Sequence, residues 1–110
     1  MTIKLNEKEY PFKFSFSAIR KLEKQTGKST TELSQELKDS LDAGKIDFDL
    51  ALNICHLGLV GGGSELTLDE VEKILDEGAG IDIGNILSAY FKNITEYFTK
   101  NLPNEASQTT

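Results

Sequence analysis

The stretch DFDLALNICHLGLV, residues 47 to 60, decides how the rest of the chain is arranged. After Asp49 its only polar positions are Asn53 and His56, so a helix over these residues is apolar on nearly all sides. Such a helix is normally buried. At fourteen residues it is too short to cross a bilayer, so we expect other helices of this chain or of a partner to cover it.

Two short strands are predicted before this helix. Thr2–Leu5 and Tyr10–Phe14 alternate apolar and polar residues, and Asn6–Glu9 provides the turn between them. Pro11 cannot donate a backbone hydrogen bond, so we expect its strand to be an edge there. Because a lone hairpin is marginally stable in water, its aromatic face should rest on helices or on another chain.

Four further helices are predicted from capping residues and apolar spacing. They begin after Ser15, Ser29, Thr67 and Asp82, and Gly27 ends the first. The positions expected to face the core are Ile19, Leu22, Leu33, Leu37, Leu41, Leu68, Val71, Ile74, Leu75, Ile83, Ile86, Leu87, Tyr90, Phe91, Ile94 and Phe98. The sequence therefore predicts an α+β, mainly helical fold: an N-terminal β-hairpin followed by about five helices around the central buried helix.

The length of 110 residues is typical of one domain. We expect that domain to span residues 1–102 and a flexible C-terminal tail to occupy residues 103–110. Gly61, Gly62 and Gly63 precede a serine and form the clearest flexible break, so they are candidate hinge residues.

The charge of the chain is negative overall and unevenly distributed. A net charge of −6 disfavours contact with phosphate backbones, so we do not expect nucleic acid as a partner. Because the central apolar segment is too short to cross a bilayer, we do not expect a membrane partner either. Residues 1–28 carry seven basic and three acidic side chains (+4), whereas residues 29–110 carry five basic and fifteen acidic ones (−10). This asymmetry would favour head-to-tail association into a homo-oligomer; the alternative is that these charges only solvate helix surfaces.

No residue pattern points to catalysis, a cofactor or a metal. Cys55 and His56 are adjacent, so on a helix they point about 100° apart, and together they supply too few ligands for zinc. The acidic pairs Glu70 with Glu77 and Asp69 with Glu72 fall on an exposed helix face, where nothing would raise a carboxyl pKa. We therefore expect a protein that is not an enzyme. One cysteine and the lack of an apolar leader make the cytoplasm the expected compartment.

The aromatic residues exceed what a small core needs. Some of this aromatic area is expected to meet a partner, and the alternative is ordinary core packing. The candidate partner-binding residues are Phe12, Phe14, Tyr90, Tyr97 and Phe98.

The order of these segments resembles the tail assembly chaperones of long-tailed, siphovirus-type bacteriophages and prophages. The resemblance covers roughly residues 3–102 and rests on pattern rather than on a site. It is carried by the hairpin sequence IKLNEKEYPFKF, the helix AIRKLEKQTG, the apolar helix ending in HLGL, the segment LTLDEV and the final long amphipathic helix. The family's turn more often reads Asn-Gly-Lys, where this chain has Glu7.

The resemblance implies a non-catalytic protein in the cytoplasm of the bacterial host. It would bind the tape-measure protein and keep it soluble while the tail tube polymerises, would also meet the major tail tube protein, and would be absent from the mature virion. In many relatives a ribosomal frameshift appends a second domain, and residues 102–110 would be the junction. Two alternatives stay open: a small virion structural protein such as a head-to-tail completion protein, and an acidic inhibitor that mimics DNA.

Overall fold

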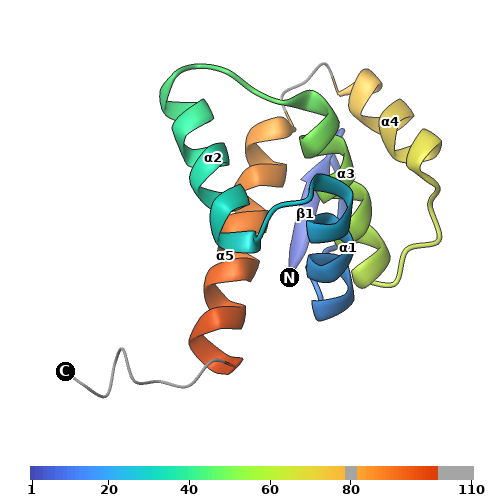
Figure 1. The fold of residues 1–110 in the computed structure, drawn as a ribbon. Coiled ribbons are helices and arrows are strands. Elements are labelled where there is room, and N and C mark those ends of the chain that lie inside the picture. Colours follow the sequence, from blue (N-terminus) through green and yellow to red (C-terminus); the bar gives the residue numbers. More distant parts are fainter. Residues whose placement is uncertain (79–81, 102–110) are drawn as a thin grey trace.

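The computed structural model of the protein describes residues 1–78 and 82–101 (Figure 1). In chain order its elements are β1 (Thr2–Leu5), β2 (Lys8–Pro11), α1 (Phe16–Thr26), α2 (Thr30–Asp42), α3 (Phe48–Gly61), α4 (Leu68–Glu77) and α5 (Ile83–Asn101). The predicted α+β, mainly helical architecture is confirmed. The expected tail over residues 103–110 lies outside the described residues.

The N-terminal hairpin is tighter than the sequence suggested. Its antiparallel register pairs Ile3 with Tyr10 and Leu5 with Lys8, so only Asn6 and Glu7 form the turn. These two residues have φ angles of 50° and 67°, the pattern of a type I′ turn, whose twist matches that of the strands. The expected four-residue turn Asn6–Glu9 is therefore wrong.

The second strand also ends earlier than expected, at Pro11 rather than Phe14. Directly after Pro11, two successive residues form single backbone hydrogen bonds with different segments. The Phe12 N–H donates to the Met1 carbonyl (2.9 Å) and the Lys13 N–H donates to the Gly58 carbonyl of α3 (3.0 Å). Segment 12–15 thus leaves the hairpin and runs against α3.

Helix α3 is the centre of the fold. It contacts α1, α4 and α5, and the Asp47 side chain caps its first turn by accepting from the Leu50 N–H (Figure 1). Its buried residues are Ala51, Ile54, Cys55, Leu57, Gly58 and Leu59. The expectation that the whole stretch is buried is wrong at Phe48 and Val60, because these residues lie near the ends of the helix, where its neighbours do not cover them.

Three glycines of α3 and its C-cap let the hairpin segment approach closely. A Cβ atom at Gly58 would overlap the ring of Phe12, one at Gly61 would overlap the Lys13 carbonyl, and one at Gly62 would overlap the Pro11 carbonyl. Only a residue without a side chain fits at such contacts. The first two candidate hinge residues are therefore packed against backbone, whereas Gly63 has a φ of 102° and open space around it.

Helix α5 anchors the hairpin with polar side chains. The Asn85 Nδ2 donates to the Lys4 carbonyl (3.2 Å), and the Asn93 Oδ1 accepts from the Phe14 N–H (3.1 Å). The Asp82 carboxylate, just before α5, is buried and accepts from the Asn6 N–H in the turn (2.9 Å). The first and last elements of the described chain are thus joined directly.

Most predicted core positions of the other helices are buried or half-buried. The two exceptions are Leu41, near the C-terminal end of α2, and Leu68, the first residue of α4, whose side chains are exposed. Both lie in end turns, where the apolar spacing continues but no neighbouring element is left to cover it. Within residues 1–78 and 82–101 we find no helix that combines the length and the apolar character needed to cross a membrane.

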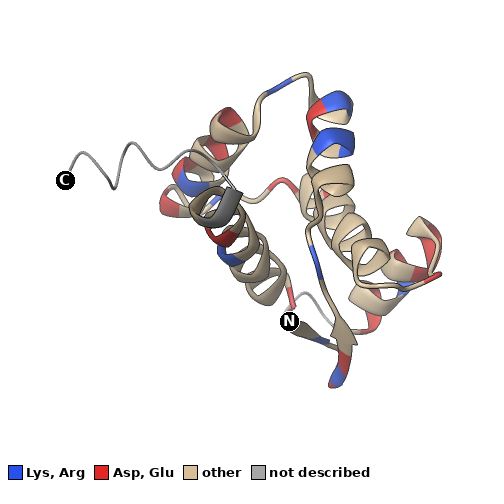
Figure 2. Ribbon diagram, turned by 90° about the horizontal axis from the view of Figure 1, so that it is seen from below, with Lys and Arg blue, Asp and Glu red and all other residues tan. Residues whose placement is uncertain are grey.

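Helices α1 and α4 differ in the sign of the charge that they carry (Figure 2). Helix α4 carries five carboxylates and one lysine, whereas α1 carries three cations and one carboxylate. Both helices pack on α3, so each presents its outer face to solvent.

Candidate partner-binding site

The structure divides the five aromatic residues that the sequence suggested for partner binding. Phe12, Phe14 and Tyr90 are at most 3% exposed and belong to the core, so their side chains offer no surface to another protein. Tyr97 and Phe98, on the last turns of α5, are half-buried and remain accessible in part. The candidate site is therefore restricted to the region around these two residues.

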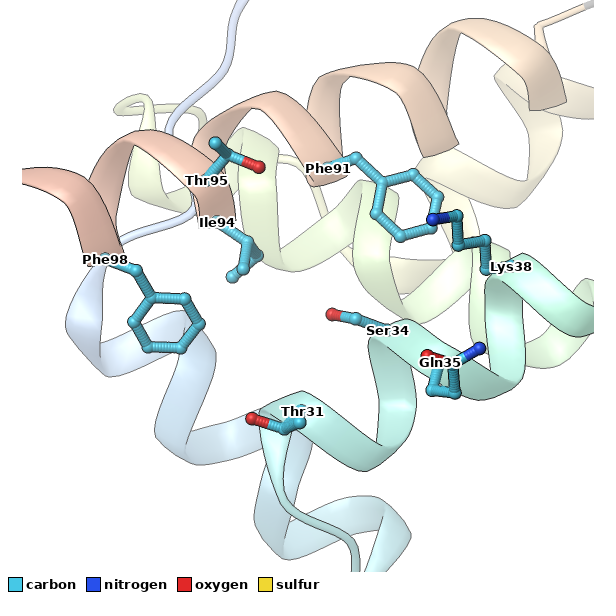
Figure 3. A pocket seen from close by; sticks show the side chains of 8 residues that line it. All are labelled: Thr31, Ser34, Gln35, Lys38, Phe91, Ile94, Thr95 and Phe98. Carbon is cyan, nitrogen blue, oxygen red and sulfur yellow. The ribbon is translucent and has the colours of Figure 1, made fainter. Parts of the chain in front are cut away.

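Phe98 lines an open groove between α2 and α5, called here the α2–α5 groove (Figure 3). Its volume is about 580 Å³. One wall comes from α5 and is mainly apolar, and the other comes from α2 and is polar. The lining residues are Phe91, Ile94, Thr95 and Phe98 on α5, and Thr31, Ser34, Gln35 and Lys38 on α2.

Tyr90 lies beneath this groove and joins its two walls. Its hydroxyl is 3.5 Å from the Ser34 Oγ, and its ring packs edge-on against Phe14 and Phe91, at centroid distances of 5.1 and 5.5 Å. Burial raises the pKa of the Tyr90 hydroxyl, the Ser34 hydrogen bond opposes that shift, and the Glu23 charge adds to it. The groove thus has a neutral floor over a packed aromatic cluster.

A row of three rings begins at Phe98, in the α5 wall of the groove. Phe98 packs edge-on against Tyr97 with centroids 6.0 Å apart, and Tyr97 stacks on Phe16 of α1 with centroids 6.5 Å apart. Phe16 is 59% exposed. Beyond these rings lies a second hollow of about 370 Å³, lined by Lys13, Phe14, Ser15, Phe16, Asn93, Glu96 and Tyr97. The C-terminal half of α5 is therefore flanked by hollows on both sides, with aromatic rings between them.

Helix α2, the polar wall, is fixed mainly at its N-terminal end. The Glu23 carboxylate of α1 accepts from both the N–H and the hydroxyl of Thr30, at 2.8 and 2.7 Å. Leu33 and Leu37 are the apolar residues that α2 buries, and every residue from 41 to 49 is exposed. The C-terminal half of α2 is therefore held by few buried contacts.

Cys55 and His56 have separate structural surroundings. Cys55 is fully buried, and desolvation, with a smaller effect of the Asp82 charge, raises the pKa of its thiol to about 12. His56 Nε2 lies 3.1 Å from the Leu66 carbonyl, which ties α3 to the segment before α4. In the part of the chain that the structure describes, no three His, Cys, Asp or Glu side chains lie close enough together to hold a metal ion.

Two exposed aromatic side chains, Phe16 and Phe48, are not among the candidate partner-binding residues that the sequence suggested. Each is the first residue of its helix, directly after the capping residue. In α1 the spacing was ambiguous, because Phe16 lies three residues before the buried Ile19 and four residues before the exposed Arg20. In α3 the spacing gave no signal, since the helix that begins at Phe48 is apolar on nearly all sides.

Comparisons of this chain with models of protein families, with curated proteins and with solved structures find no match.

Proposed function

We propose that this protein is a tail assembly chaperone, a non-catalytic protein that binds a phage tape-measure protein and keeps it soluble while the tail tube forms. The observation that carries the proposal is the α2–α5 groove, an open hollow with one apolar wall and one polar wall. The segment order that resembles this family adds to it. The proposed compartment is the cytoplasm of the bacterial host.

The chemistry of the groove suits an amphipathic client helix. Such a helix places its apolar stripe in a hydrophobic groove through residues spaced three and four apart. Phe91, Ile94 and Phe98 follow this same spacing on α5 and would meet that stripe. Ser34, Gln35 and Lys38 on α2 would meet the polar edge of the client, where hydrogen bonds and a positive charge are available.

The acidic surface of the protein suits a complex that contains many copies. A net charge well away from zero keeps proteins in solution by mutual repulsion. With a net charge of −6, each bound copy would add negative charge to an otherwise apolar client. This would oppose aggregation of the client before the tube covers it.

The test is co-expression with a long tape-measure protein, followed by measurement of the soluble fraction of that client. We expect wild-type protein to raise the soluble fraction and to be recovered with the client. The double variant Phe91→Ser and Phe98→Ser should lose both effects, because it makes the apolar wall polar. Leu68→Ser is the matched control, since it removes a partly exposed apolar side chain from α4, outside the groove.

Two results would contradict the proposal. The first is equal client solubility with the groove variant and with wild type, once circular dichroism has shown that both are folded. The second is detection of the protein by mass spectrometry in purified virions, which is the result expected for a virion structural protein.

A further inference from the structure

A further apolar hollow lies on a different part of the molecule, between α3 and α4, and is called here the α3–α4 groove. Its volume is about 380 Å³, and it is lined by Phe48, Asp49, Leu52, Glu72, Leu75, Asp76 and Ile83. The Phe48 side chain is 66% exposed. A ring this exposed, beside a hollow with partly buried leucines, is typical of an interaction surface.

All charged side chains of this groove are carboxylates. Asp49, Glu72 and Asp76 lie around its apolar floor, and none of them forms an ion pair within residues 1–78 and 82–101. These carboxylates are not grouped as a metal site. The surface that fits here must therefore combine positive charges with an apolar side chain.

The outer face of α1 has that combination. Phe16 is 59% exposed, and Arg20 and Lys24 follow it at four-residue intervals, so the three side chains lie on one face of the helix. Lys21 lies beside this row. No ion pair involves Arg20, Lys21 or Lys24 in the described part of the chain. The α1 face thus offers one exposed ring and three unpaired cations.

We infer that the α1 face of one copy docks in the α3–α4 groove of a second copy. The two surfaces are complementary in charge, and each contributes an exposed phenylalanine, whose burial would supply apolar area. Helices α1 and α4, which carry the two surfaces, lie at different edges of the molecule and both pack on α3 (Figure 2). One copy can therefore use both surfaces at once, which permits head-to-tail growth of the assembly.

This inference does not depend on the proposed chaperone function, because it concerns the purified protein without a client. It is tested by sedimentation velocity at about 50 mM and about 500 mM salt. Ion pairs between exposed surfaces are screened as salt rises, so we expect self-association at low salt and at least about tenfold weaker association at high salt. A wild-type protein that stays monomeric at low salt would overturn the inference.

Charge-reversal variants locate the two surfaces. Arg20→Glu with Lys24→Glu removes the basic face, and Glu72→Lys with Asp76→Lys removes the acidic groove; each protein alone should be monomeric. Mixed in equal amounts, the two variants should associate again, in equal proportion. In this mixture the intact groove of the first variant faces the intact α1 face of the second, and the two reversed surfaces are again opposite in charge, so the two variants should alternate along the assembly.

The matched controls are Lys92→Glu and Glu65→Lys, which alter exposed charges outside both surfaces and should leave association unchanged. Phe48→Ser should weaken association without changing charge. Monomers in the mixture, or unaltered association of either double variant, would exclude this interface. If the wild type remains monomeric yet binds a synthetic basic amphipathic peptide through Glu72, the groove takes a foreign partner and the second copy is the wrong occupant.

Discussion

The ring of Phe12 lies directly against the backbone of Gly58, at the place where a side chain on that glycine would be. The next residue continues the contact, because the Lys13 N–H donates to the Gly58 carbonyl at 3.0 Å. Phe12 is among the largest fully buried side chains of the protein. The docking of the hairpin on α3 therefore requires a residue without a Cβ atom at position 58.

We expect Gly58→Ala to destabilise the protein by about 1–3 kcal/mol, the usual cost of forcing an extra carbon into a packed core. The measurement is urea unfolding followed by circular dichroism. Gly84→Ala is the control, since Gly84 lies on the exposed face of α5 with open space around it. That variant should gain up to about 1 kcal/mol from the better helix propensity of alanine. Equal effects of the two variants would contradict the close contact.

Glu7 has a φ of 67°, which a side chain makes unfavourable. Glu7→Gly should therefore stabilise the protein by about 0.5–1 kcal/mol, because glycine adopts this angle without a steric cost. Thermal unfolding measures the change. Glu9→Gly, in β2, should instead lower the melting temperature, and a similar loss for Glu7→Gly would argue against the two-residue turn.

The Asp82 carboxylate is the acceptor for the Asn6 N–H across the fold. Asp82→Ala should cost about 1.5–3 kcal/mol, since it removes a hydrogen bond to a charged group and leaves a donor unpaired. Asp82→Asn keeps an acceptor oxygen and should cost less. Chemical denaturation of the two variants compares these losses, and equal stability of wild type and Asp82→Ala would refute the role of this bond.

Because the Cys55 thiol is buried, we expect the free energy of unfolding to fall at alkaline pH. Its pKa is raised to about 12 in the folded protein, from 9.0, so between these values the unfolded chain releases a proton that the folded protein retains. Unfolding is therefore favoured as pH rises above 9, by about 1 kcal/mol at pH 10. Tyr90, whose pKa is also raised, acts in the same direction at higher pH.

Urea titrations of wild type and Cys55→Ala at pH 7 and pH 10 separate the thiol from other groups. We expect the free-energy difference between the two proteins to shift by about 1 kcal/mol in favour of the variant at pH 10. A constant difference would show that the thiol is not buried. In the native protein, the same thiol should react with an aromatic disulfide reagent only as fast as the chain unfolds.

The helices were predictable because their signals are local. Ser15, Ser29 and Thr67 each cap a helix at the position that the sequence indicated, and Ser29 and Thr67 each form a capping box. Each cap depends on residues three or four positions away. The order of elements and the central place of α3 follow from the same local patterns.

The hairpin docking and the candidate site were less predictable because they depend on distant contacts. The glycine run at residues 61–63 reads as a flexible break, yet Gly61 and Gly62 lie against Lys13 and Pro11, some fifty residues earlier. The hinge itself stays a prediction, and Gly63 is the glycine at which motion is least constrained by packing. Likewise, periodicity alone did not separate the core ring of Tyr90 from the partly exposed ring of Phe98, eight residues later on the same helix.

The hydrogen bonds that join the hairpin to α5 can form only late in synthesis, after α5 has been made. The ribosome makes residues 2–11 long before residues 83–101, yet Asn6 and Phe14 find their partners at Asp82 and Asn93. Contacts of such sequence separation delay folding, because the intervening chain must be closed into a loop first. Before α5 has left the ribosome, the nascent hairpin can dock only on α3, and the native structure is completed when α5 emerges.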